Sequence, residues 1–185
     1  MNALGRFASI LTLLLALVPV LAKADPLDPF LGRWVGAAEL ADHRTGTLQE
    51  RDVDTIVKRE SDGFRLEWSS VIRSDGRRDV PGVRYVEREV LLTRAADRPY
   101  FMQTPEYDPF RKRQSLTPMA GDALGWATVT DGTLDLFVFG ITQDGAAELQ
   151  HHRRVLTDDG MDLFYTGFVA GEQVADGSGR LVRVD

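Results

Sequence analysis

The sequence contains no cysteine among its 185 residues. That absence excludes disulfide bonds, catalysis by a thiol and metal sites built from thiolates. It also excludes a lipid-anchored lipoprotein, since no cysteine follows the apolar stretch near the start of the chain. Whatever fold the chain adopts must therefore be stabilised by a hydrophobic core.

Long apolar runs are scarce as well. The longest spans residues 7–21, about fifteen residues, and falls short of the ~20 that a membrane-spanning helix needs. Arg6 precedes this run, and Ala22-Lys23-Ala24 follows it with the small-x-small pattern of a signal-peptidase site. We therefore predict that residues 1–24 are a cleaved signal peptide and that the protein is exported, to the periplasm or outside the cell. A retained anchor helix is the alternative.

Positive charge is under-represented in the predicted mature chain, residues 25–185. Without Arg6 and Lys23, 20 basic residues stand against 28 acidic ones, a net charge of −8. A chain with this negative net charge is a poor candidate for binding nucleic acid or an anionic membrane. Its 161 residues are the length of one domain with its own core.

Helical periodicity is absent from the mature chain, whereas a period of two recurs. In residues 64–73, Phe64, Leu66 and Trp68 alternate with polar residues, as in a strand with one buried face. Ser61-Asp62-Gly63 and Asp131-Gly132 are typical hairpin turns. The pattern predicts strands at residues 30–40, 48–59, 64–73, 83–93, 100–103, 123–130, 133–142, 146–156, 161–170 and 181–184.

Most predicted connections are only two to four residues long, so strands that follow one another in sequence should be neighbours in space. The fold class predicted is all-β: an antiparallel up-and-down meander that closes into a barrel of eight to ten strands. Pairing between the first and last strands would remove both edges of the sheet.

Gly32-x-Trp34, at the head of the first strand, resembles the motif of lipocalins and of the wider calycin group, including bacterial lipocalin-like and nitrobindin-like domains. The Thr-Asp-Tyr signature of conventional lipocalins is absent, so the resemblance is to a lipocalin-like barrel. It implies that Trp34, together with Gly32, closes one end of the barrel beneath an arginine of the last strand, Arg183 or Arg180.

The interior of an eight-stranded barrel holds packed side chains or one small ligand. If the apolar residues Leu149 and Val155 face inward, strand alternation also turns His151 and Arg153 inward. The same reasoning turns Arg51 and Arg59 inward from the second strand. The apolar wall would comprise Phe64, Leu66, Trp68, Ile72, Leu136, Val138, Leu163 and Tyr165.

Inward arginines need a counter-charge, because burying an unpaired cation is costly. The leading hypothesis is that a hydrophobic, anionic small molecule supplies it, in the way that fatty-acid-binding proteins of the calycin group seat their ligands. The predicted ligand-binding residues are Arg153, His151, Arg51, Trp68, Tyr165 and Phe64. Alternatively, Glu67, Glu87 or Glu89 pairs with the arginines, or a one-residue register shift turns His151 and Arg153 to solvent.

Three other functions remain open. His151 could ligate haem iron, as a histidine does in nitrobindin-like domains. Some calycins are isomerases or dehydratases, and Tyr85, Tyr165 and His151 would be the acid–base groups of such an enzyme. The barrel could also be packed solid and serve as a structural or interaction domain of the cell envelope.

No catalytic motif supports an enzyme strongly. The serines have no nearby base with which a nucleophile could be paired, and no phosphate-binding loop or zinc-ligand spacing occurs. His151 and His152 are consecutive, so in a strand they point to opposite faces and cannot ligate one metal ion. We predict no metal site and leave the oligomeric state open.

Overall fold

The computed structural model describes residues 24–73, 85–105 and 115–184. Apart from Ala24, the predicted signal peptide lies outside the described residues, so export stays a prediction. The strands are β1 (Gly32–Asp42), β2 (Thr47–Glu60), β3 (Gly63–Ile72), β4 (Tyr85–Arg94), β5 (Phe101–Gln103), β6 (Leu124–Thr130), β7 (Thr133–Ile141), β8 (Ala147–Thr157), β9 (Gly160–Val169) and β10 (Glu172–Val184). Two short 3-10 segments, η1 (Asp28–Phe30) and η2 (Pro118–Ala120), are the helical elements of the described chain.

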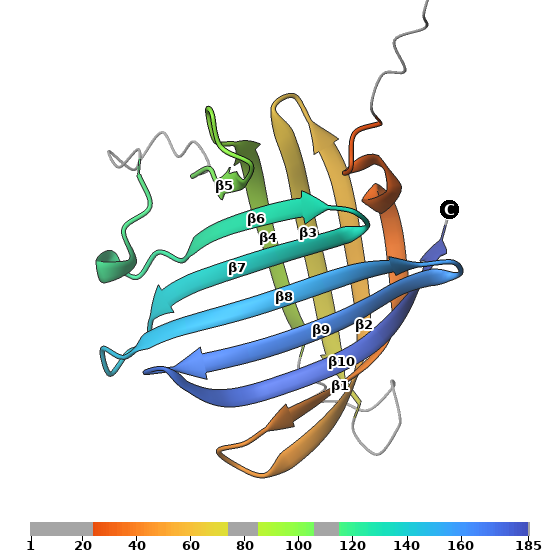
Figure 1. Cartoon of the computed structure of the whole chain (residues 1–185). Helices are drawn as coiled ribbons and strands as arrows, with labels where there is room; N and C mark the ends of the chain where they lie inside the picture. The colour runs from red at the N-terminus through yellow and green to blue at the C-terminus, as the bar shows by residue number, and fades with distance from the viewer. Residues whose placement is uncertain (1–23, 74–84, 106–114, 185) are drawn as a thin grey trace, which may run out of the picture.

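The ten strands form a closed antiparallel barrel in which every strand pairs with its neighbours in sequence. β10 closes the ring by pairing with β1 from Arg33↔Val184 to Asp42↔Ala175. Strands β6–β9 form the wall nearer the viewer and cross β2–β4 of the far wall at a steep angle (Figure 1). The predicted fold class, an up-and-down antiparallel barrel of eight to ten strands, is confirmed.

Strand boundaries agree with the predicted ones within one or two residues except at the C-terminus. The last strand was predicted to start at Leu181, after Gly177 and Gly179, but β10 starts at Glu172 and contains both glycines. Glycine suits these positions because β10 lies so close to β1 there that a larger side chain would collide with β1. A Cβ added to Gly179 would come within 2.5 Å of the Ala38 Cβ.

One end of the barrel is packed solid. Phe30, Phe64, Leu92, Leu134, Leu136, Met161 and Leu181 are fully buried there. Leu27 and Phe30 of the segment before β1 cover this end, and Trp34 Nε1 donates a hydrogen bond of 2.9 Å to the Phe30 carbonyl. The N-terminal segment thus acts as a plug, and the barrel can be hollow only toward its other end.

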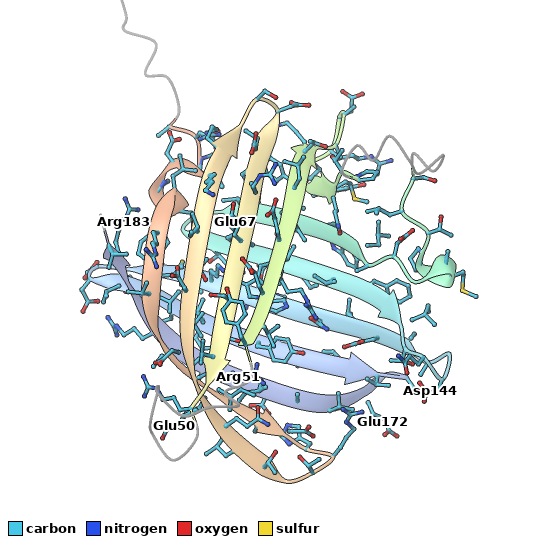
Figure 2. The ribbon with its side chains drawn as sticks, turned by 180° about the vertical axis from the view of Figure 1, so that it is seen from behind. Glu50, Arg51, Glu67, Asp144, Glu172 and Arg183 are labelled. Carbon is cyan, nitrogen blue, oxygen red and sulfur yellow. The ribbon has the colours of Figure 1, made fainter. Side chains whose placement is uncertain are left out.

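Arg183 lies over this plug. Its guanidinium carbon is 4.5 Å from the centre of the Trp34 ring, and its Nη2 donates to the Pro29 carbonyl. Figure 2 places Arg183 and Arg51 toward opposite ends of the barrel. Gly32 opens β1 with a φ of 118°, which favours glycine. Gly32, Trp34 and Arg183 are the three residues that, by the lipocalin-like resemblance, close this end of the barrel.

Candidate functional site

A cavity of about 300 Å³ occupies the half of the barrel opposite the plug. Most of its lining comes from the inward-facing rows of β1–β4, β8 and β9: Leu40, Arg51, Val53, Thr55, Trp68, Ser70, Val86, Arg88, Gln150, His152, Arg154, Leu163 and Tyr165. Gly177 and Ser178 of β10 and three residues of the outward rows, Glu39, Arg153 and Phe164, also border it. The volume is within the range of small-molecule sites. A barrel packed solid throughout, one of the four functional alternatives, is therefore wrong.

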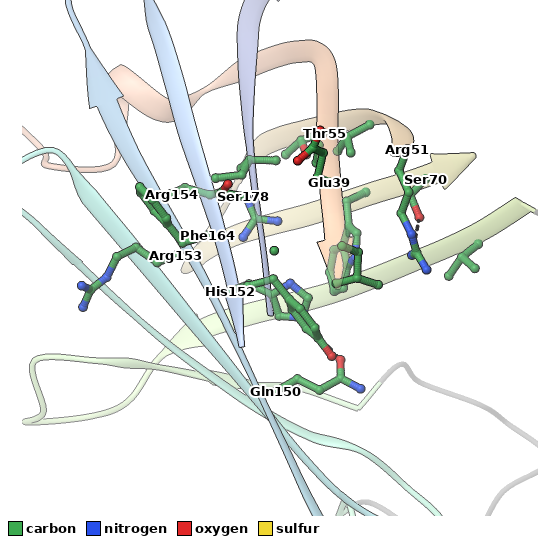
Figure 3. Close-up of a pocket in the computed structure, with 18 of the residues that line it drawn as sticks. Glu39, Arg51, Thr55, Ser70, Gln150, His152, Arg153, Arg154, Phe164 and Ser178 are labelled. Atoms are coloured by element: carbon green, nitrogen blue, oxygen red, sulfur yellow. Dashed lines mark hydrogen bonds between the residues drawn. The ribbon is translucent and has the colours of Figure 1, made fainter. Parts of the chain in front are cut away.

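The inward face of β8 carries an uninterrupted row of four polar residues. Glu148, Gln150, His152 and Arg154 alternate along it, while His151 and Arg153 lie on the outer face. The predicted orientation of His151 and Arg153 is therefore wrong by one residue. Figure 3 shows Arg154 pointing into the cavity and Arg153 pointing away from it.

The reason for the error lies on the outer surface. His151 stacks on Phe137 with ring centres 4.4 Å apart, and Phe137 stacks in turn on Trp126 at 5.4 Å. These side chains cover one another on the outside of β6–β8. The apolar face of β8 is thus the outer one, and the rule that apolar residues face inward fails on this strand.

Asp135 holds His151 and Arg153 in place outside the barrel. Its Oδ1 accepts hydrogen bonds from Arg153 Nε at 2.8 Å and from His151 Nε2 at 2.6 Å. Burial raises the pKa of Asp135, but the bonds from Arg153 and His151 outweigh it and leave this pKa below its usual value. Both predicted ligand residues thus have a carboxylate partner on the outer face.

Arg154 is the most unusual residue of the cavity. It is 3% exposed, and its Nε and Nη1 are buried without a hydrogen-bond partner among the described residues. No described carboxylate forms an ion pair with it. Its guanidinium carbon lies 5.9 Å from the Trp68 ring centre, and burial lowers its pKa to about 10. Arg154 remains charged at neutral pH, so the cavity contains a cation whose donors are not satisfied.

The predicted glutamate partners of the inward arginines lie on the outer face of the barrel. Glu67 pairs with Lys58 at 2.6 Å and Glu89 pairs with Arg65, all on the outer face. Glu87 also lies on the outward row, opposite Ser69.

Arg51 faces the same cavity, as predicted from its parity. Its Nη2 donates to Gln49 Oε1 at 2.8 Å, and its Nη1 lies 3.4 Å from Ser70 Oγ. Arg59 has the same parity but lies at the plugged end, where it bonds the carboxylates of Asp25 and Asp28. Arg51 and Arg154 are therefore the arginines of β2 and β8 that face the cavity, whereas Arg153 borders it with its side chain pointing away.

Aromatic rings line the cavity beside Arg154. The centre of the His152 ring is 5.4 Å from that of Trp68 and 5.0 Å from that of Tyr165. Burial lowers the pKa of His152 to about 3, helped by the positive charges of Arg154 and His151, so His152 is neutral. Burial, with the nearby Glu148 carboxylate, raises the pKa of Tyr165. Phe64 was grouped with these residues in the prediction, but it packs against Phe101 in the solid half.

Haem ligation was predicted through His151, which faces away from the cavity. His152 takes the inward position, but its ring packs between Trp68 and Tyr165, and its Nε2 is 3.4 Å from Gln150 Oε1. Haem therefore does not fit the residues present. Of the acid–base groups considered for an isomerase, Tyr165 lines the cavity, whereas Tyr85 is exposed on β4.

The described residues contain no cluster of three or more His, Cys, Asp or Glu that could bind a metal ion. Within the same residues, no helix is long and apolar enough to span a membrane.

Solved structures with the same barrel identify the fold. The chain superposes on an S-type phycobiliprotein lyase from Guillardia theta with a TM-score of 0.52 and 16% identity, over 86% of this chain and 93% of that one. The fold is a calycin-like barrel. A protein of unknown function from the DUF3598 family of Nostoc punctiforme gives a TM-score of 0.51 and 14% identity, over 85% of this chain. This chain spans about half of that protein, 49% of its length.

No protein-family model and no curated protein sequence matches the chain. Identities of 14–16% show a common fold and carry no activity from one protein to the other.

The sequence carries a signal at Arg154 and His152, but that signal by itself points the wrong way. The four residues Glu148, Gln150, His152 and Arg154 form an uninterrupted polar row at every second position. Such a row normally marks the solvent side of a strand. Only the pairing of β8 with β7 and β9 shows that it faces the barrel interior.

Proposed function

We propose that this calycin-like barrel binds a small amphipathic molecule whose anionic group is held by Arg154. The observation that carries the proposal is the guanidinium of Arg154, buried in the cavity with two donor nitrogens unpartnered among the described residues. Buried charges in proteins are ordinarily paired. A ligand carboxylate accepts two parallel hydrogen bonds from a guanidinium, from Nη2 together with either Nε or Nη1, and would supply a partner for one of the two unpartnered nitrogens.

The cavity also supports an apolar or aromatic body for the ligand. Trp68 and Tyr165 provide flat apolar surface next to the charge, and Val53 and Leu163 complete the wall. Arg51 and Arg88 add positive charge around the same cavity. The combination favours a molecule with one acidic group and a hydrophobic body, such as a fatty acid.

The structural neighbours are consistent with this proposal. One of them is named a phycobiliprotein lyase, so proteins with this barrel are not confined to structural roles.

The test is a comparison of two neighbouring arginines on opposite faces of β8. We expect Arg154→Met to weaken binding of dodecanoate about 30-fold, which corresponds to about 2 kcal/mol for a desolvated charge. Arg153→Met changes the outer face, where Arg153 is 49% exposed, and should leave the affinity within twofold. Isothermal titration calorimetry of the two variants measures both. Equal effects of the two substitutions, or no effect of Arg154→Met, would refute the proposal.

A further inference from the structure

A second cavity lies next to the first, where β5 is short. It has a volume of about 290 Å³, and its lining shares Trp68, Arg88 and Gln150 with the first cavity. The two cavities therefore adjoin at these three side chains. An elongated molecule bound at Arg154 would have to pass Trp68 to reach the second cavity.

The short strand explains why there is space at this position. β5 pairs with β6 at only two positions, Phe101↔Ala127 and Met102↔Trp126, whereas β6 pairs with β7 along its whole length. Small residues add to the space. Gly121, Ala123 and Gly140 line the second cavity, and a Cβ added to Gly140 would meet no atom within 4 Å.

The second cavity contains a buried hydrogen-bonding group without a partner. Gln103 faces inward from β5, and its Oε1 is buried with no hydrogen bond to any described residue. The neighbouring amide is already engaged, since Gln150 Nε2 donates to Glu148 Oε1 at 2.8 Å. An unsatisfied buried amide oxygen is costly unless a ligand group bonds to it. A hydroxyl can both donate and accept, and therefore suits an amide in either orientation.

We infer that the ligand is a long bifunctional acid, with its anionic end at Arg154, its chain beside Trp68 and a hydroxyl at its far end that bonds to Gln103. This inference rests on the proposed function and specifies the ligand class. Arg154 and Gln150 are four residues apart on β8, or about 13 Å along a strand. A compact anion would reach Arg154 but leave the amide of Gln103 unpartnered.

The experiment compares dodecanoate with its ω-hydroxy analogue by titration calorimetry. We expect the hydroxy acid to bind about tenfold more tightly to the unsubstituted protein, the upper effect of one buried hydrogen bond. Gln103→Leu should remove this difference, because leucine has no group that bonds to the hydroxyl. Met102→Leu is the matched control, because Met102 is the adjacent residue and faces outward, opposite Trp126. It should preserve the tenfold preference.

A second variant tests the path of the chain without altering Gln103. Gly140→Leu places a side chain in the second cavity, and it should weaken both twelve-carbon acids about tenfold while leaving hexanoate binding unchanged. Equal affinity for dodecanoate and its hydroxy analogue, combined with loss of both in Arg154→Met, overturns this inference and leaves the proposed function standing. Failure of both acids to bind the unsubstituted protein overturns the further inference and the proposed function together.

Discussion

Replacing Arg154 by methionine should stabilise the ligand-free protein while weakening its affinity for acids about 30-fold. Most substitutions at fully buried positions destabilise a protein. Arg154 is an exception because its charge is desolvated, two of its donor nitrogens are unpartnered among the described residues, and no described carboxylate pairs with it. Methionine fills a similar elongated space and has no donor to satisfy.

The magnitude follows from the contacts of the guanidinium. Each buried donor left unsatisfied costs about 1–3 kcal/mol, so two of them cost about 2–6 kcal/mol. The cation–π interaction with Trp68, at 5.9 Å, offsets about 0.5–2 kcal/mol of this cost. We therefore expect Arg154→Met to increase the free energy of unfolding by about 2 kcal/mol, within the range found when buried ionic groups are replaced by apolar ones. For a chain of this size the melting temperature should rise by about 4–8 °C.

The assay is urea unfolding followed by tryptophan fluorescence, with and without dodecanoate. A ligand at one hundred times its Kd for the unsubstituted protein stabilises that protein by about 2.7 kcal/mol. At the same concentration, a variant with about 30-fold weaker affinity should be stabilised by about 1 kcal/mol or less. A loss of 3–5 kcal/mol in the ligand-free variant would refute the reasoning. Losses of that size are typical of a broken buried ion pair and would mean that Arg154 has a partner within the protein.

Two further predictions concern the seam of the barrel and its response to pH. Gly179→Ala should lower the free energy of unfolding by about 1–3 kcal/mol, because its Cβ would come within 2.5 Å of Ala38. Gly140→Ala is the control: Gly140 has open space around it, so the free energy of unfolding measured in urea should change by less than about 0.5 kcal/mol. His152 has a pKa of about 3 in the folded protein and of 6.5 in the unfolded chain. Between these pH values the unfolded state therefore binds more protons than the folded state. The free energy of unfolding should fall by up to about 1.4 kcal/mol per pH unit as the pH drops from 6.5 toward 3. His152→Gln should flatten this part of the stability profile, and an unchanged slope would contradict burial of a neutral His152.

The sequence determined the barrel because strand alternation and turn chemistry are local. Phe64, Leu66 and Trp68 repeat at every second position, and Asp-Gly and Ser-Asp-Gly segments separate the strands. With short turns, an antiparallel meander is the simplest arrangement. The Gly177–Gly179 segment was not recognised as strand because glycine weakens a strand in isolation. Its close approach to β1 becomes visible only when the ring is closed.

The cavity residues depend on information that no single strand contains. On β3 the apolar face is the inner face, and the predicted orientation of Trp68 agrees with the structure. On β8 the apolar residues lie outside, and Arg154 and His152 take the interior positions predicted for Arg153 and His151. A shift of one residue exchanges the two faces of a strand. Local alternation alone cannot distinguish these registers when both faces have a structural role.

The sequence by itself thus determined that this protein is an antiparallel barrel, since hairpins form between neighbouring segments. Only the tertiary structure decided that one half of the barrel is filled by Phe30 and Trp34 and that the other half is hollow around Arg154. Whether an arginine is buried or solvated depends on the strands opposite it across the barrel, and those strands are distant in the sequence.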